Sequence, residues 1–199
     1  MQSHMPGRNP QSRVEFIAMM AMLFAMVAFS IDSMLPALPE MGAELSPGGP
    51  NRAQLILTAF VIGLGLGTFI IGPVSDAIGR KPMVLVGAAI YLVGAVLASM
   101  AQTLETMLLA RALQGLGASG PRVVGMAVIR DLYSGREMAR ISSFVMFIFV
   151  LFPAVAPLMG QGIIAVGGWR GIFVAFVLFM LTGVGWMQLR MVETLPRAA

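Results

Sequence analysis

The chain has 199 residues, of which 58% are hydrophobic and 11% are charged, and its mean hydropathy is +0.87. Soluble domains are nearer half apolar and a quarter charged, so this composition excludes an ordinary soluble domain and predicts a membrane protein. The formal net charge is +4 and the isoelectric point about 10.7, but the basic residues lie in short patches between apolar runs, which argues against a nucleic-acid partner.

Side chains suited to catalysis or metal binding are scarce. The chain has no cysteine, which removes disulfides, thiolate nucleophiles and cysteine metal sites. Its one histidine, His4, lies near the N-terminus, so a metal centre or a histidine-based dyad would lack its usual ligand or base. We therefore expect neither an enzyme nor a bound metal or cofactor.

Six apolar windows are each long enough for the roughly 20 helical residues that cross ~30 Å of hydrocarbon. The connections between them are too short to hold a second domain. The first window is too long for a cleavable signal and no small-residue cleavage site follows it. We expect a cytoplasmic segment (1–15), a six-span helical bundle (16–189) and a cytoplasmic tail (190–199). The windows are 16–38, 53–75, 82–100, 107–129, 141–166 and 171–189.

The basic residues predict the orientation. Only Arg52 and Arg170 fall on one side of the expected membrane, whereas nine fall on the other. Because lysine and arginine favour the cytoplasmic side, both termini are predicted to be cytoplasmic, as an even number of spans requires. Twelve of the thirteen basic residues are arginine, which is typical of a GC-rich bacterial genome and indicates the bacterial cytoplasmic (inner) membrane. The nine are Arg8, Arg13, Arg80, Lys81, Arg130, Arg136, Arg140, Arg190 and Arg197.

The first window contains a carboxylate, Asp32, in the run FAMVAFSIDSMLPALP (24–39). A central charge costs roughly 2.5–3.5 kcal/mol on insertion scales, so such residues usually face a cavity or a partner. At ~1.5 Å per residue, Asp32 lies about 24 Å from the cytoplasmic start, and Arg111 of the fourth window lies at a similar depth. Asp32 is interpreted as a proton-binding group, with a static Asp32–Arg111 ion pair as the alternative. Pro36 and Pro39 fall at the outer end, where they cost little.

Glycines in the second and fourth windows predict close helix packing. Gly63 and Gly67 are four residues apart, a spacing that lets helix backbones approach closely in lipid. The stretch Gly115–Gly120 spells G-x-G-x-x-G, but a dinucleotide site needs a preceding strand, and here the glycines lie inside an apolar window. Close packing explains this stretch better than nucleotide binding.

The loop between the second and third windows resembles a known signature. It reads Gly72-Pro-Val-Ser-Asp76-Ala-Ile-Gly79-Arg80-Lys81-Pro82. This is similar to the cytoplasmic motif G-x-x-x-D-R-x-G-R-K-P of the major facilitator superfamily, with Ala77 in place of the usual arginine.

Other stretches agree with this resemblance. The fourth window has Arg111-Ala-Leu-Gln114-Gly115, similar to the family's arginine motif, and the fifth has Pro153-Ala-Val-Ala156-Pro157-Leu-Met-Gly160, similar to its antiporter motif with Ala156 replacing a glycine. The run 32–39 is similar to a motif of drug:proton antiporters. Together with Trp169-Arg170 and Glu193-Thr-Leu-Pro196, the pattern looks most like the bicyclomycin/chloramphenicol-resistance (Bcr/CflA) branch.

The resemblance covers essentially the whole chain but only the N-terminal half of the family's twelve-span fold. It implies an all-α bundle of two inverted three-helix repeats, with the substrate cavity between two such halves. Asp32 and Arg111 are the implied proton-coupling residues. The candidate substrate-cavity residues are Asp32, Met34, Arg111, Gln114 and Arg122.

The resemblance also implies a cytoplasmic gate. In the family, the equivalent of Asp76 contacts a helix end in the opposite half, which in a homodimer would be the fifth span of the second copy. Arg80 is expected to pair with Asp131, which follows the fourth window on the same face; the plainer alternative is that Arg80 and Lys81 only set topology. The implied gate residues are Gly72, Asp76, Gly79, Arg80, Lys81 and Asp131.

The expected function is proton-coupled efflux of small amphipathic compounds by a homodimer that rebuilds twelve spans in the lipid bilayer. The alternative is a non-transporting half, which needs a missing C-terminal half or acts as an assembly subunit. An intramembrane protease is disfavoured because there is no G-x-S-G motif and no histidine in a span. A channel is disfavoured because no Asn-Pro-Ala repeat and no polar re-entrant loop is present.

Overall fold

In the computed structural model, residues 12–191 and 193–194 are described, and this part of the chain is helical with no strand. The predictions for Arg8 and Arg197 lie outside the described residues. So does most of the predicted cytoplasmic segment 1–15, and much of the predicted tail 190–199. The elements are α1 (Arg13–Asp32), the 3-10 helix η1 (Leu35–Ala37), α2 (Leu38–Leu45), the 3-10 helix η2 (Pro50–Gln54), α3 (Leu55–Ile78), α4 (Arg80–Ser99), α5 (Leu104–Leu132) and α6 (Gly135–Arg190).

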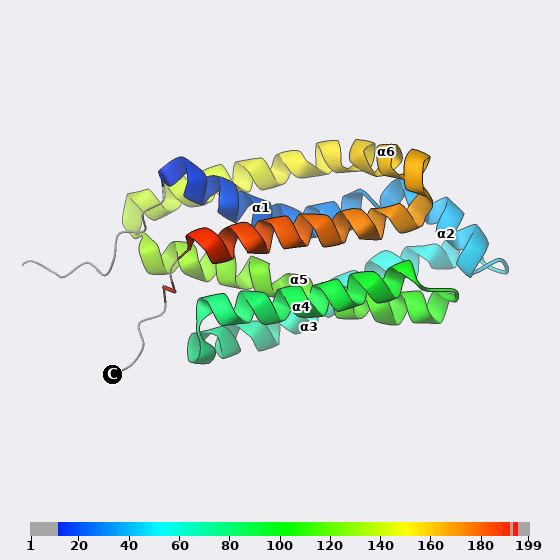
Figure 1. Ribbon diagram of the computed structural model, residues 1–199, viewed down its shortest axis with the longest axis horizontal. Helices are drawn as coiled ribbons and strands as arrows, with labels where there is room; N and C mark the ends of the chain where they lie inside the picture. The colour runs from blue at the N-terminus through cyan, green and yellow to red at the C-terminus, as the bar shows by residue number, and fades with distance from the viewer. Residues whose placement is uncertain (1–11, 192, 195–199) are drawn as a thin grey trace, which may run out of the picture.

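Each of the six predicted windows corresponds to helix in the structure. The fifth and sixth windows both lie in α6, whose chain direction reverses at Gly168 (φ 61°, ψ −172°), so that its two halves run back along each other (Figure 1). A positive φ is accessible to glycine without a Cβ penalty, which explains the residue type at this turn. Four helical segments of the described chain are long and apolar enough to cross a membrane: Arg13–Leu45, Asn51–Ile78, Arg80–Ser99 and Gly135–Arg190.

The end of the first helix differs from the prediction. The window was expected to continue to residue 38, but α1 ends at Asp32. A turn at Ser33 and Met34 follows, and Pro36 lies in the first turn of η1. A proline cannot donate a backbone hydrogen bond but fits the first turn of a new helix, so hydropathy alone overestimates the length of α1. Asp32 therefore lies at a helix end rather than inside a continuous helix.

The helices pack as two interleaved groups. α1 packs against both halves of α6, whereas α5 packs against α3 and α4, and α4 also contacts α6 (Figure 1). Phe29 of α1 illustrates the first group, since its ring lies 5.1–6.4 Å from the rings of Phe152, Phe176 and Phe179 of α6. The first group thus joins helices that are distant in the sequence, whereas the second group consists of the consecutive helices α3, α4 and α5.

Glycines allow α3, α4 and α5 to touch at the backbone. A Cβ atom at Gly63 would overlap the carbonyl oxygen of Ala112, and one at Gly115 would overlap the carbonyl oxygen of Phe60. Gly117 contacts the backbone of Tyr91 in the same way. The G-x-G-x-x-G stretch therefore lies within α5 as a helix-packing surface, which confirms the packing interpretation over a nucleotide site.

Side chains close both ends of the bundle. At one end Arg190 donates to Glu15 (2.7 Å), so the first and last described helices meet there. At the opposite end Glu44 of α2 accepts from the indole of Trp169 (2.7 Å) and from the guanidinium of Arg170 (2.7 Å). The Trp169-Arg170 pair thus fastens α2 to the turn of α6.

Candidate functional site

Asp32 lies at the break after α1 and is partly buried. Within the described part of the chain its carboxylate has no hydrogen bond and no ion pair. Its neighbour Ser33 is fully buried, and the Ser33 hydroxyl is satisfied by the carbonyl of Phe29 (2.5 Å). Asp32 is thus a carboxylate whose acceptor capacity is unused at the end of a buried helix.

Arg111 is fully buried in α5 and binds groups other than Asp32. Its Nη1 donates to Gln114 Oε1 (2.5 Å) and its Nη2 donates to the Ser30 carbonyl (2.9 Å). The guanidinium lies 4.3 Å from the Phe60 ring centroid and 5.9 Å from that of Phe176. Two aromatic faces offset part of the cost of a buried cation that lacks a carboxylate partner.

The direct Asp32–Arg111 ion pair, which was the alternative to a proton-binding role for Asp32, is therefore absent among the described residues. Axial depth placed the two residues at similar heights, but height says nothing about the direction in which each side chain leaves its helix. The connection is indirect, because Arg111 holds the carbonyl of Ser30, two residues before Asp32. The Ser30 hydroxyl in turn hydrogen-bonds the Tyr91 hydroxyl (2.6 Å), which joins α1, α4 and α5.

The antiporter-like stretch meets the same break. A Cβ atom at Gly160 would overlap the carbonyl oxygen of Ser33, so α6 touches the backbone directly after Asp32. Ala156, one turn earlier, is also fully buried, whereas Pro153 is exposed and Pro157 is partly buried. The structure thus brings the 32–39 stretch and the 153–160 stretch into contact, although they begin 121 positions apart in the sequence.

The candidate cavity residues do not share one accessible surface in this structure. Met34, Arg111 and Gln114 are fully buried, while Arg122 is exposed and Asp32 is partly buried. The turn after α1 directs Met34 into the core, where side-chain packing excludes solvent. This bundle alone therefore does not place the five residues on one open surface, and because the predicted cavity lies between two such halves, the cavity assignment stays a prediction.

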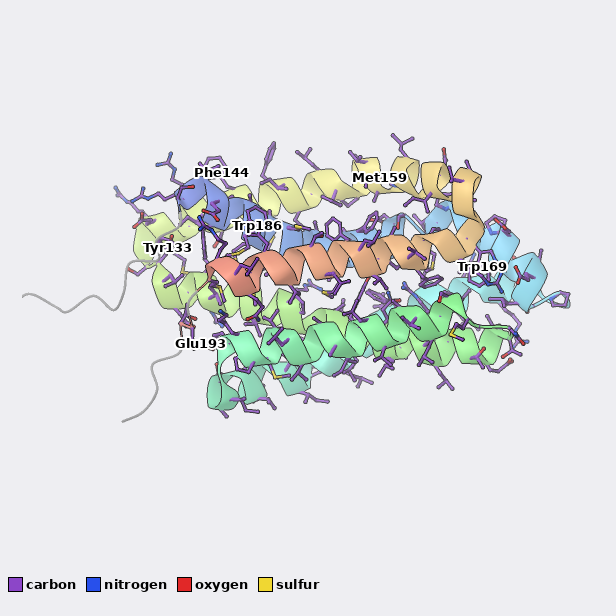
Figure 2. The ribbon with its side chains drawn as sticks, in the orientation of Figure 1. Tyr133, Phe144, Met159, Trp169, Trp186 and Glu193 are labelled. Atoms are coloured by element: carbon purple, nitrogen blue, oxygen red, sulfur yellow. The ribbon has the colours of Figure 1, made fainter. Side chains whose placement is uncertain are left out.

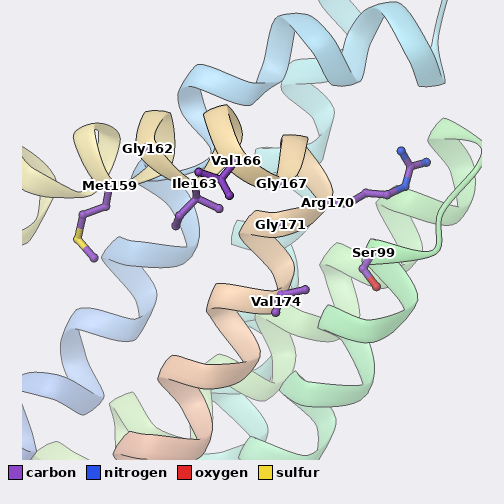
Figure 3. Close-up of a pocket in the computed structure, with 9 residues that line it drawn as sticks. All are labelled: Ser99, Met159, Gly162, Ile163, Val166, Gly167, Arg170, Gly171 and Val174. Atoms are coloured by element: carbon purple, nitrogen blue, oxygen red, sulfur yellow. The ribbon is translucent and has the colours of Figure 1, made fainter.

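A large apolar groove lies elsewhere, beside the turn of α6. It has a volume of about 910 Å³ and is bordered by Met159, Ile163 and Val174 of α6 and by Ser99 of α4, with Gly162, Val166, Gly167, Arg170 and Gly171 completing it (Figure 3). None of the five candidate cavity residues borders it. Arg170 is already bound to Glu44, so this groove offers no free charge for recognising a polar ligand.

The predicted pairing of Arg80 with Asp131 is confirmed. Arg80 Nε donates to Asp131 Oδ2 (2.9 Å), and Nη1 donates to Asp76 Oδ1 (2.5 Å) and to Ser75 Oγ (2.8 Å). Gly79 has φ 116°, which allows the chain to turn between α3 and α4 and bring Arg80 between both carboxylates. Asp76 is thus bound within its own chain, and a Cβ atom at Gly72 would only just reach Val123 (4.0 Å).

Glu193 belongs to the Glu193-Thr-Leu-Pro196 run that supports the resemblance, but the sequence predicted no structural role for its carboxylate. Its carboxylate accepts from the backbone N–H groups of Arg80 (3.0 Å) and Lys81 (3.0 Å), at the start of α4 (Figure 2). An anion at a helix N-terminus satisfies unpaired N–H groups and complements the helix dipole. Lys81 Nζ completes the contact by donating to the carbonyls of Gln188 (3.1 Å) and Met191 (2.6 Å). Both charges of Arg80-Lys81 therefore have structural partners, beyond any effect on topology.

We expect Glu193→Gln to lower the stability of the bundle by about 1 kcal/mol, because a charge-assisted hydrogen bond at a helix N-terminus becomes a neutral one. In a protein of this size that corresponds to a fall of about 2–4 °C in the unfolding midpoint. Thermal unfolding in detergent, followed by circular dichroism, measures the change. Glu105→Gln is the control, because Glu105 also lies in the first turn of a helix, α5, but is exposed and accepts no hydrogen bond among the described residues, so it isolates the hydrogen bonds made by Glu193. Equal midpoints for the two variants would contradict a capping role for Glu193.

Long apolar helices that pack through glycines and bury charged side chains define a multi-pass helical membrane bundle. The chain belongs to the Major Facilitator Superfamily, whose family model matches residues 18–197. It is 34% identical over 192 residues to the uncharacterized MFS-type transporter YdgK of Bacillus subtilis, covering 94% of this chain and 48% of that protein. It is also 34% identical over 157 residues to a chloramphenicol resistance protein of Pseudomonas aeruginosa, covering 78% and 37% of the two chains.

The fold is also shared with a solved transporter. The crystal structure of the human organic anion transporter MFSD10 (TETRAN) superposes with a TM-score of 0.71 at 18% sequence identity, over 95% of this chain and 49% of that one. The present chain spans about half the length of the curated relatives it matches.

Proposed function

We propose that the protein takes part in proton-coupled efflux of small amphipathic compounds across the bacterial cytoplasmic membrane. In this proposal the chain crosses the membrane six times and both termini are cytoplasmic. Family membership and a relative named for chloramphenicol resistance support transport and the substrate class. The observation that carries the proton-coupling part is Asp32, a carboxylate without a polar partner in the described chain at the break of a buried helix.

In this mechanism Asp32 exchanges a proton when water reaches the end of α1 and holds it when the surrounding helices close. A neutral carboxyl group is tolerated in a low-dielectric site, whereas an unpaired carboxylate is costly there, so water access and protonation are linked. Arg111 holds the Ser30 carbonyl and Gly160 touches Ser33, so both fix the position of the helix end that carries Asp32. No cofactor is needed beyond the proton gradient.

The cluster around Arg80 supports a second role, as a lock at the opposite end of the bundle. Arg80 joins Asp76 at the end of α3 to Asp131 at the end of α5, and Glu193 joins the start of α4 to the end of α6. In rigid-body movement between two six-span halves, the helix ends within one half keep their relative positions. We infer that the cluster keeps the four helix ends together while the bundle moves as one body.

The substrate cavity requires a second six-span bundle, because the family's cavity lies between two halves and this chain spans about half the length of its relatives. We propose a homodimer in which Asp32, Arg111, Gln114, Met34 and Arg122 of each copy contribute to or support the shared cavity. The competing arrangement is a missing C-terminal half, or a non-transporting subunit.

Oligomeric state separates these arrangements. The homodimer predicts a particle of about twice 21.1 kDa when the protein is extracted in mild detergent and weighed by native mass spectrometry. The dimer should persist on dilution if it buries an interface typical of permanent assemblies. A particle that weighs 21.1 kDa at every protein concentration tested would end the homodimer proposal and favour the missing-half arrangement.

A further inference from the structure

A second groove lies between the first turns of α1 and α6, at the end of the bundle where Glu15 meets Arg190. We call it the Arg140 groove, and its volume is about 410 Å³. Its wall is mainly apolar and is formed by Val14 and Ile17 of α1 and by Ile141 and Phe144 of α6. Figure 2 shows Phe144 at this end of the molecule, close to the beginning of α1. The groove is therefore an apolar slot that opens at one end of the helices.

The charges at the rim of the Arg140 groove do not balance. Arg13 and Glu137 form an ion pair across it (2.7 Å) and so neutralise each other. Arg140 has no ion pair and no hydrogen bond in the described part of the chain; its guanidinium lies 6.0 Å from the Phe144 ring centroid. One positive charge is thus left at the mouth of an apolar slot, and exposed Arg136 one turn earlier adds to the same potential.

We propose that the Arg140 groove binds one anionic phospholipid, with the phosphate at Arg140 and an acyl chain against Val14, Ile17 and Phe144. The proposal does not depend on transport. Basic pockets between membrane helices on the side where basic residues gather are suited to acidic headgroups. The apolar wall favours a lipid over a free phosphate ion, because apolar side chains are stabilised by contact with hydrocarbon. A zwitterionic lipid also carries a phosphate, but its own ammonium cancels that charge, so the net positive charge at the rim would not be neutralised.

Native mass spectrometry of the whole chain in detergent tests the proposal. Phosphatidylglycerol or phosphatidylcholine with the same acyl chains is titrated, and the fraction of protein carrying one lipid is measured. We expect phosphatidylglycerol to bind more tightly than phosphatidylcholine. Arg140→Gln should weaken the first phosphatidylglycerol about fivefold, because one basic residue near an anionic headgroup contributes about 1 kcal/mol. Phe144→Ala should weaken it by a similar factor through lost apolar contact.

Matched controls separate this site from general attraction to the surface. Arg130→Gln removes an exposed charge at the end of α5 outside the groove, and Phe147→Ala removes an exposed ring of α6 that does not border it. Both should bind phosphatidylglycerol as the unaltered chain does. Three results would overturn the proposal: equal weakening by Arg130→Gln and Arg140→Gln, equal binding of both lipids, or full displacement of the lipid by glycerol phosphate. Loss of a dimer in Arg140→Gln, with unchanged lipid binding, would also overturn it and assign the groove to a second protein copy.

Discussion

Asp32→Asn is expected to reduce proton-driven efflux to below roughly a tenth of the unaltered rate, because it removes the one carboxylate at the break of α1 while keeping its size. Asparagine cannot exchange a proton, so substrate movement would no longer respond to an imposed pH gradient. Efflux of a fluorescent amphipathic dye from proteoliposomes, with and without a pH gradient, measures both effects. The fold should be retained, since Asp32 makes no polar contact in the described structure whose loss would destabilise it.

Glu40→Gln is the matched control for Asp32. Glu40 is the next acidic residue along the chain and is exposed in the first turn of α2, where its replacement alters the local charge equally. Efflux and its dependence on the pH gradient should be unchanged in this variant. If Asp32→Asn transports as well as Glu40→Gln, and responds equally to the gradient, the assigned role of Asp32 is wrong.

Gly63→Ala is expected to destabilise the bundle by about 1–3 kcal/mol, because the added methyl group would collide with backbone that cannot rotate away. The ideal Cβ position overlaps the carbonyl oxygen of Ala112, so α3 and α5 would have to separate. The loss should appear as a midpoint of thermal unfolding several degrees lower, at about 2–4 °C per kcal/mol.

The neighbouring Gly65 provides the control on the same helix. A Cβ atom at Gly65 has nothing within 4 Å, so Gly65→Ala should leave the midpoint unchanged or raise it slightly through better helix propensity. Because both substitutions lie on α3 and are measured in the same host and detergent, the difference between their midpoints reports only the contact made at each glycine. Equal effects of the two substitutions would show that close contact between α3 and α5 does not limit stability.

The helices were predictable from the sequence because a membrane leaves little choice of secondary structure for apolar segments of about 20 residues. Gly63 and Gly115 could be assigned to helix contacts for the same reason, since small residues gather where membrane helices touch. The Arg80–Asp131 pair could also be predicted from the sequence, because both residues follow spans that end on the same side of the membrane. The helices and the Arg80–Asp131 pair depend on position along the membrane axis, and the glycine contacts depend on residue size, and both are visible in the sequence.

Features that depend on rotation about a helix, or on contacts between distant segments, were missed. The direction of Arg111 is decided by Phe60, Gln114 and the Ser30 carbonyl, and axial depth carries no information about it. Hydropathy continues through Met34 and Leu35, so it could not locate the end of α1 at Asp32. The contact of Glu193 with α4 joins residues 113 positions apart, and only the general preference of carboxylates for helix N-termini could have suggested it.

The anchoring of Glu193 has a practical consequence for labelling. A reporter attached after residue 199 would begin at most about 18 Å from Thr194, because five residues reach no more than ~3.6 Å each. Thr194 itself lies 3.4 Å from Asp131, beside the Arg80 cluster. A fluorophore or spin label fused there would therefore report on the helix ends joined by Arg80, and its distance to those ends should stay constant through a transport cycle if the bundle moves as one body.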